Sequence, residues 1–109
     1  MKFSLVIVIF GFCVSLAQGE RKLEFNRDIR PILSNGCFHC HGPDEKKRKS
    51  ELRLDLESDA FKPAKSGFPA IVKGYSEESE LITRIFLPDD DDDHMPPLDS
   101  GKSITKEQK

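Results

Sequence analysis

Five consecutive residues, Cys37-Phe38-His39-Cys40-His41, carry the strongest chemical signal in the sequence. Two cysteines separated by two residues and followed at once by a histidine are typical of covalent haem attachment. Each thiol adds to one vinyl group of the haem, so the two sulfur atoms must lie one helical turn apart on the same side. The histidine then lies beneath the macrocycle, where an imidazole nitrogen reaches the iron. We therefore predict that Cys37 and Cys40 attach haem c and that His41 is an axial ligand of its iron.

A haem bound through His41 leaves one axial position of the iron open, and Met95 is the first candidate for it. Met1 falls in the N-terminal apolar segment, so Met95 is the only methionine in the rest of the chain. Two prolines follow it and restrict the backbone there, which would hold the thioether sulfur in place. Ligation by His and Met suits electron carriers because thioether sulfur favours ferrous iron. His94 is the competitor, and bis-histidine ligation would give a lower reduction potential.

Two other kinds of protein use the same side chains. A zinc-binding interaction module would combine Cys37, Cys40 and His94 with either His41 or His39. Zinc sites usually contain a second closely spaced ligand pair, whereas His94 has no such neighbour in the sequence. A thiol–disulfide oxidoreductase would need the cysteines in a thioredoxin-like βαβ context, and the predicted strands are too short and too few. Haem attachment therefore remains the leading hypothesis.

The composition indicates one small domain with a thin core. The chain has 109 residues and a formal net charge of −2, with acidic and basic residues interleaved. This balance argues against a dedicated nucleic-acid binder, which would be clearly basic. Hydrophobic residues make up 37% of the chain, and part of them lies in the first twenty residues. A small domain with so thin a core needs an additional stabilising element such as a metal, a disulfide or a cofactor. A haem is a large apolar group and would supply it.

The first 19 residues have the pattern of a secretory signal peptide. Lys2 precedes a nearly unbroken apolar run from Phe3 to Leu16, and Ala17-Gln18-Gly19 predicts cleavage after Gly19. The apolar run is shorter than the roughly 18 to 20 residues of a membrane-spanning helix. Cleavage would also remove Cys13. We therefore expect an exported protein, in the periplasm or at the cell surface, with no membrane span left in residues 20–109.

Short elements joined by loops are expected after residue 20. Asn26 is predicted to cap a helix that Pro31 ends or kinks. Apolar residues alternate with polar ones from Leu52 to Leu56, which predicts a short strand that could pair with a second one at Ala70–Val72. The expected fold is therefore mainly α, with a short two-stranded β element.

A second helix is predicted to begin at a Ser76 cap and to stop at Pro88. Its apolar stripe contains Leu81, Ile82, Ile85 and Phe86. Thr105 and Gln108 then have the spacing of a capping box, which marks the start of a helix. Because the chain stops at Lys109, we expect a C-terminally truncated domain that lacks its closing helix.

Two runs of like charge flank the second half of the chain. The basic run is Lys46 to Lys49, and the acidic run is Asp89 to Asp93. The acidic run lacks the alternation and the glycine of an EF-hand, and both runs are predicted to be solvated loops. Arg53 or Arg84 is a candidate partner of haem propionates on the grounds of charge.

Several blocks of the sequence together resemble the planctomycete-type cytochrome c domain, over about Leu23 to Gln108. The blocks are Phe25-Asn26-Arg27-Asp28-Ile29-Arg30-Pro31-Ile32-Leu33, Cys37-x-x-Cys40-His41-Gly42-Pro43-Asp44, Leu52-Arg53-Leu54-Asp55, Ala70-Ile71-Val72, Ser79-Glu80-Leu81-Ile82 and Met95-Pro96-Pro97. Tyr75 and Ser76 depart from the family's Asp-Pro helix start.

The resemblance implies a cytochrome c-like haem domain over residues 20–109, with His41 and Met95 as axial ligands. It also implies an exported electron-transfer domain, which often stands at the N-terminus of a longer protein. Its partner would be a redox protein or a downstream domain of the same parent protein. No substrate pocket or acid–base pair is evident in the sequence, so we expect no enzymatic activity of its own.

Overall fold

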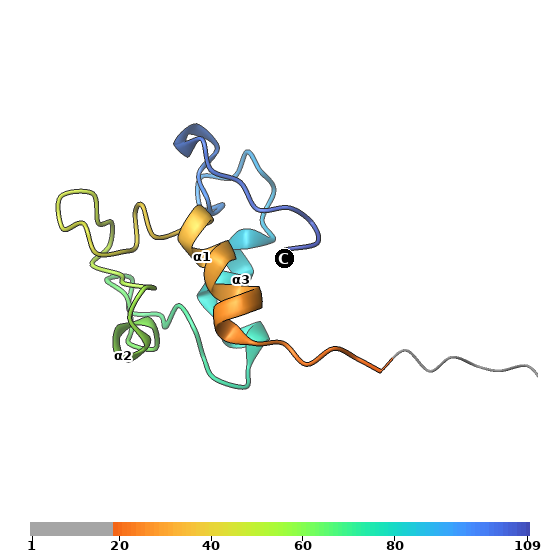
Figure 1. Ribbon diagram of the computed structural model, residues 1–109. Helices are drawn as coiled ribbons and strands as arrows, with labels where there is room; N and C mark the ends of the chain where they lie inside the picture. Colours follow the sequence, from red (N-terminus) through yellow and green to blue (C-terminus); the bar gives the residue numbers. More distant parts are fainter. Residues whose placement is uncertain (1–18) are drawn as a thin grey trace, which may run out of the picture.

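The computed structural model describes residues 19–109. The predicted signal peptide therefore lies, except for Gly19, outside the described residues. Short helices are joined by long irregular loops (Figure 1). In chain order they are the π-helical turn η1 (Phe25–Ile29), α1 (Arg30–Gly36), α2 (Glu57–Ala60), the 3₁₀ turn η2 (Ser76–Glu78), α3 (Glu80–Ile85) and the 3₁₀ turn η3 (Leu98–Ser100). None of the helices between residues 19 and 109 is long and apolar enough to cross a membrane.

The predicted two-stranded β element is wrong. Across residues 19–109, β-pairing is limited to an isolated antiparallel bridge between Pro63 and Pro69. In the first expected strand, the Leu54 N–H donates to the His41 carbonyl (2.9 Å) instead of to a second strand. The alternation therefore correctly predicted that Leu54 is buried, but Leu56 is 39% exposed, and other loops take the backbone hydrogen bonds.

The second expected strand bonds to the start of α3. The Pro69 and Ala70 carbonyls accept the N–H groups of Glu80 (3.2 Å) and Leu81 (2.9 Å). The first N–H groups of a helix have no partner within the helix, so this extended segment satisfies them. The expectation of a mainly α fold holds only in a limited sense, because the helices are short and loops dominate residues 19–109.

Of the two predicted effects of Pro31, an end or a kink of the first helix, the end is wrong, because Pro31 lies in the first turn of α1, directly after η1. A proline lacks an N–H and its ring clashes with the carbonyl four residues earlier. The wider π-helical turn η1 precedes it, with the Arg30 N–H bonded to the Phe25 carbonyl.

The predicted helix cap at Asn26 is also wrong. Asp28 accepts the Glu24 N–H (2.8 Å) and pairs with Arg27 (2.8 Å). These contacts lower the pKa of Asp28 to about 2, with the hydrogen bond from Arg27 as the largest cause.

The second predicted helix forms as η2 followed by α3, and its N-cap is Ser79 rather than Ser76. Ser79 is only 2% exposed. Its hydroxyl accepts the Val72 N–H (2.8 Å) and lies 3.0 Å from the Tyr75 carbonyl, to which it can donate. This hydroxyl therefore ties the extended segment 70–72 to the start of α3. The predicted apolar stripe is correct for Ile85, which is buried, but Phe86 is 61% exposed.

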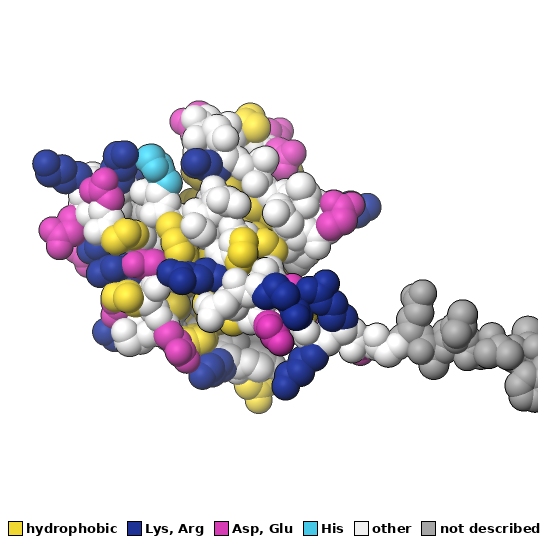
Figure 2. Space-filling model, in the orientation of Figure 1, with side chains coloured by type: hydrophobic (Ala, Val, Ile, Leu, Met, Phe, Trp, Pro, Cys, Tyr) yellow, Lys and Arg dark blue, Asp and Glu magenta, His cyan; other side chains and the backbone are white. Residues whose placement is uncertain are grey.

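The core is small, as the composition predicted. Leu54, Ala60 and Ala70 form a buried cluster. Partly buried hydrophobic residues pack against it, namely Cys37, Phe38, Leu52, Ile71 and Leu81. Hydrophobic side chains also reach the surface at several places between charged ones (Figure 2). The cluster thus joins the end of α1, α2 and α3 directly beneath the cysteine motif.

Replacing Ser79 by alanine should destabilise the fold by about 1–3 kcal/mol, because the partly buried Val72 N–H loses its partner. The free energy of unfolding from chemical denaturation measures the effect. Ser103→Ala removes a hydroxyl from an exposed position and should change the stability little. Equal effects of the two substitutions would show that the Ser79 hydroxyl has no structural role.

Candidate functional site

The cysteine motif forms a tight turn at the end of α1. Cys37 is the C-cap of the helix, and its N–H donates to the Leu33 carbonyl (2.8 Å). The Cys37 carbonyl then accepts the N–H groups of Cys40 (3.2 Å) and His41 (2.8 Å). The two cysteines are free thiols in this turn, separated by the single helical turn that the spacing predicts.

The imidazole of His41 is held by one of its two nitrogens. Nδ1 lies 3.2 Å from the Lys49 carbonyl oxygen, and because a carbonyl can only accept, Nδ1 must carry the hydrogen. The other nitrogen, Nε2, is then unprotonated and free to bind a metal. Burial lowers the pKa of His41, with a smaller contribution from the positive charge of Arg84, while the Lys49 carbonyl acts in the opposite direction. The site thus favours the neutral ring that coordinates iron.

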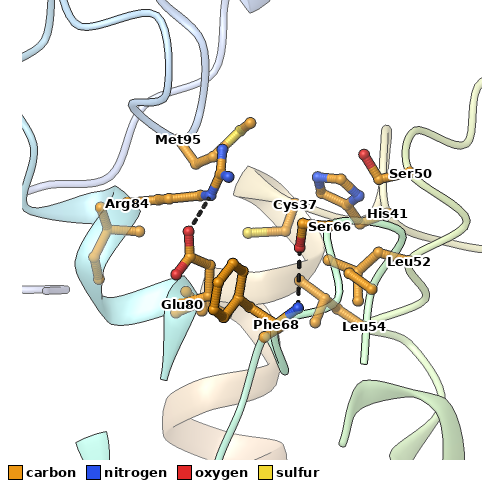
Figure 3. Close-up of a pocket in the computed structure, with 14 residues that line it drawn as sticks. Cys37, His41, Ser50, Leu52, Leu54, Ser66, Phe68, Glu80, Arg84 and Met95 are labelled. Atoms are coloured by element: carbon orange, nitrogen blue, oxygen red, sulfur yellow. Dashed lines mark hydrogen bonds and ion pairs between the residues drawn. The ribbon is translucent and has the colours of Figure 1, made fainter. Parts of the chain in front are cut away.

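Cys37, His41 and Met95 line one pocket of about 100 Å³. Apolar side chains form most of its wall, namely Leu52, Leu54, Ala64, Ala70, Leu81 and Ile85. In Figure 3 Cys37 lies between His41 on one side and Met95 with Arg84 on the other. The pocket is therefore apolar, with a thiol, an imidazole and a thioether at its edge.

The backbone around Met95 is tied to α3 and lies near α1. The Met95 N–H donates to the Arg84 carbonyl (3.2 Å). Pro96, the next residue, is buried, and it lies with Ile104 beside Gly36 at the end of α1. This packing brings Met95 to the pocket of Cys37 and His41, although many residues separate them in the sequence.

His94 and His39 lie away from this pocket. His94 is buried and lines a different cavity, together with Asp89 and Pro96, and His39 is exposed. Neither side chain lines the pocket of Cys37 and His41. Among residues 19–109, no group of three or more His, Cys, Asp and Glu side chains is arranged to hold a metal ion. The alternative zinc site built on the cysteine motif is therefore not assembled.

Two charged residues of α3 line the same pocket. Arg84 Nε lies 3.0 Å from Glu80 Oε1, as the dashed line in Figure 3 shows. Arg53, the other arginine considered for a propionate, does not line the pocket and pairs with Asp55 (2.6 Å). Sequence analysis missed Glu80 at the pocket, although its spacing of four residues from Arg84 is the sign of a helical ion pair.

The chemistry of the side chains that line the pocket suits a covalently bound haem, but the cavity itself is small. Burial raises the pKa of Cys37 to about 11, with Cys40 nearby acting in the same direction, so Cys37 is a neutral thiol. Cys40 does not line the pocket, although it shares the turn. The cavity is smaller than the roughly 300–1,000 Å³ of cofactor sites. Binding a haem therefore requires the rim to move, and Phe68 at that rim is 64% exposed.

Comparison with known protein families finds one match: the family described as Planctomycete cytochrome C, over residues 37–99. This range covers more than half of the chain, from the first cysteine of the motif to a point beyond Met95. No curated protein and no solved structure matches the chain.

Substitution of Gly42 by alanine should disrupt the turn that holds the motif. Gly42 is buried, and a Cβ atom there would overlap the Phe38 carbonyl oxygen. We expect a loss of about 1–3 kcal/mol in the free energy of unfolding, measured by chemical denaturation. In the matched variant Gly36→Ala, the new Cβ meets Ile104 at 3.4 Å, an ordinary contact. A Gly42→Ala protein as stable as Gly36→Ala would contradict this account of the turn.

Proposed function

The chain belongs to the planctomycete cytochrome C family, whose role is haem-binding electron transfer, and we propose that it is an exported c-type cytochrome domain. In this proposal Cys37 and Cys40 attach the haem covalently, and His41 and Met95 are the axial ligands of the iron. The observation that supports this proposal most directly is that Cys37, His41 and Met95 line one apolar pocket. A bound haem supplies an iron that alternates between the ferric and ferrous states.

The residues around the pocket support these roles. The Lys49 carbonyl orients the His41 ring so that Nε2 is available, which is how partners of metal-bound histidines fix the tautomer. The Arg84 carbonyl holds the backbone of Met95. The leucine, isoleucine and alanine side chains of the wall keep water from the metal and so influence its potential.

Arg84 is the better candidate of the two arginines to neutralise a haem propionate. Its side chain lines the pocket, and its partner Glu80 is a carboxylate that a propionate can replace chemically. Arg53 is engaged with Asp55 outside the pocket lining.

Export and electron transfer to a separate partner complete the proposal. The signal-peptide pattern of residues 1–19 supports export, to the periplasm or the cell surface. We propose that the domain passes electrons to a redox protein and catalyses no reaction itself. Two of the titratable groups lining the pocket already have other roles, since His41 is assigned to the iron and Glu80 is paired with Arg84.

Covalent haem attachment should depend on both cysteines. The protein, made with a cytochrome c maturation system, should keep a haem stain after denaturing electrophoresis, and Cys37→Ala/Cys40→Ala should lose it. His39→Ala is the matched control, because His39 lies within the motif but is exposed, and it should keep the stain. Absence of stain in the unmutated protein would refute covalent attachment.

Ligation by Met95 should be visible in the ferric spectrum. The charge-transfer band typical of methionine–iron ligation should be present in the unmutated protein and disappear in Met95→Ala. His94→Gln should retain the band, because His94 does not line the pocket. A band that survives in Met95→Ala would exclude Met95 as the ligand.

A further inference from the structure

His94 has a buried nitrogen that the haem site does not use. The residue is only 8% exposed, and its Nδ1 lies 3.0 Å from the Pro96 carbonyl oxygen. Because the carbonyl can only accept, Nδ1 carries the hydrogen, and in the neutral ring Nε2 then presents a lone pair. This Nε2 is buried and has no hydrogen-bond partner among residues 19–109. Such an unpaired buried atom is uncommon in folded proteins and calls for an explanation.

The carboxylate of Asp89 lies close to this nitrogen. Its Oδ1 lies 3.4 Å from Nε2. When the ring is neutral, with its hydrogen on Nδ1, a lone pair and a carboxylate face each other, which is unfavourable unless a cation lies between them. The distance fits a shared metal ion. Zinc bonds of about 2.0–2.2 Å to N and O in tetrahedral geometry place the two ligand atoms about 3.4 Å apart.

The surroundings favour a cation. Asp89 and His94 line a cavity of about 110 Å³, and Asp89 also borders a hollow lined by Asp90, Asp91 and Asp92. Clustered carboxylates raise the local concentration of cations. Lys102 and Lys109 line the His94 cavity and oppose this effect, but the Lys109 ammonium lies over the Phe86 ring at 5.7 Å.

We propose that His94 Nε2 and the Asp89 carboxylate bind a divalent cation of the zinc class. The hydrogen bond from Nδ1 to a backbone carbonyl is the support that metal-bound histidines generally have. Residues 19–109 contain no third ligand arranged for the same ion, so water completes the coordination and the ion exchanges readily. The bound ion links the acidic run to the segment of Met95 and Pro96, in a cavity that shares only Met95 with the lining of the haem pocket. The site goes beyond electron transfer and does not depend on it.

A zinc titration of the haem-loaded protein tests the proposal, with binding followed by calorimetry. We expect one Zn²⁺ per chain, and an affinity at least about tenfold lower in Asp89→Asn and in His94→Gln. The Asp89 side chain is 79% exposed, so its variant should fold normally even if the His94 variant does not. Asp90→Asn is the matched control, because it removes the same charge from the same run, and it should bind as the unmutated protein does.

Three results would overturn the proposal. Equal loss in Asp89→Asn and Asp90→Asn would mean diffuse attraction to the acidic run. Displacement of Zn²⁺ by similar concentrations of Ca²⁺ would mean an all-oxygen site, because calcium does not favour imidazole. Absence of Zn²⁺ binding would leave only an ion pair between Asp89 and protonated His94. The haem stain is read separately, and Cys37→Ala/Cys40→Ala should still bind one Zn²⁺, so a failure of haem attachment is distinguishable.

Discussion

The turn from Cys37 to His41 is the constraint on which the rest of the structure depends. Its two outward carbonyls, those of Cys40 and His41, accept N–H groups of Lys49 (2.7 Å) and Leu54 (2.9 Å). The Lys49 carbonyl in turn holds the His41 ring. One short turn therefore fixes the loop that follows it, the buried Leu54 and the orientation of an imidazole. Buried backbone groups must find partners, and here the motif itself provides them in place of a sheet.

The small core and the pocket belong to one apolar region. Leu54 and Ala70 belong to the buried cluster and also line the pocket beside Cys37. A domain with few buried side chains gains stability when an apolar group fills such a space, since burial of apolar surface contributes about 25 cal/mol per Å². Binding of a haem would therefore enlarge the core as well as supply the redox centre. The exposed Phe68 at the rim is well placed to cover it.

The segment that carries Met95 has different chemistry on its two sides. Met95 lines the apolar pocket of Cys37 and His41 and also borders the cavity of His94, whereas the adjacent His94 lies beside Asp89 and does not line the apolar pocket. Contact of the segment with both the Arg84 carbonyl and the end of α1 keeps this division in place.

Local patterns were enough to find the cysteine motif, the small core and the α3 region, and they singled out Met95, which lines the same pocket as Cys37 and His41. The capping box is also present as predicted, with reciprocal hydrogen bonds between Thr105 and Gln108 (2.8 and 3.2 Å). These features depend on residues close together in the sequence or on residue type, so a linear pattern contains them. The family resemblance added the order of the blocks, and the match over residues 37–99 confirms the family.

Tertiary structure alone decided where backbone hydrogen bonds go and which way the histidines face. The alternating leucines suggested a strand, but Leu54 bonds to the motif and Ala70 to the start of α3. Pro31 was expected to end or kink the first helix, but the π-helical turn before it accommodates the missing N–H and the proline ring. His94 and Met95 are neighbours in the sequence, and only packing decided that Met95, but not His94, lines the pocket of Cys37 and His41. The backbone hydrogen bonds, the turn at Pro31 and the placement of His94 and Met95 have one physical reason in common. Each depends on partners distant in the sequence or on exact backbone geometry, which residue type and spacing do not specify.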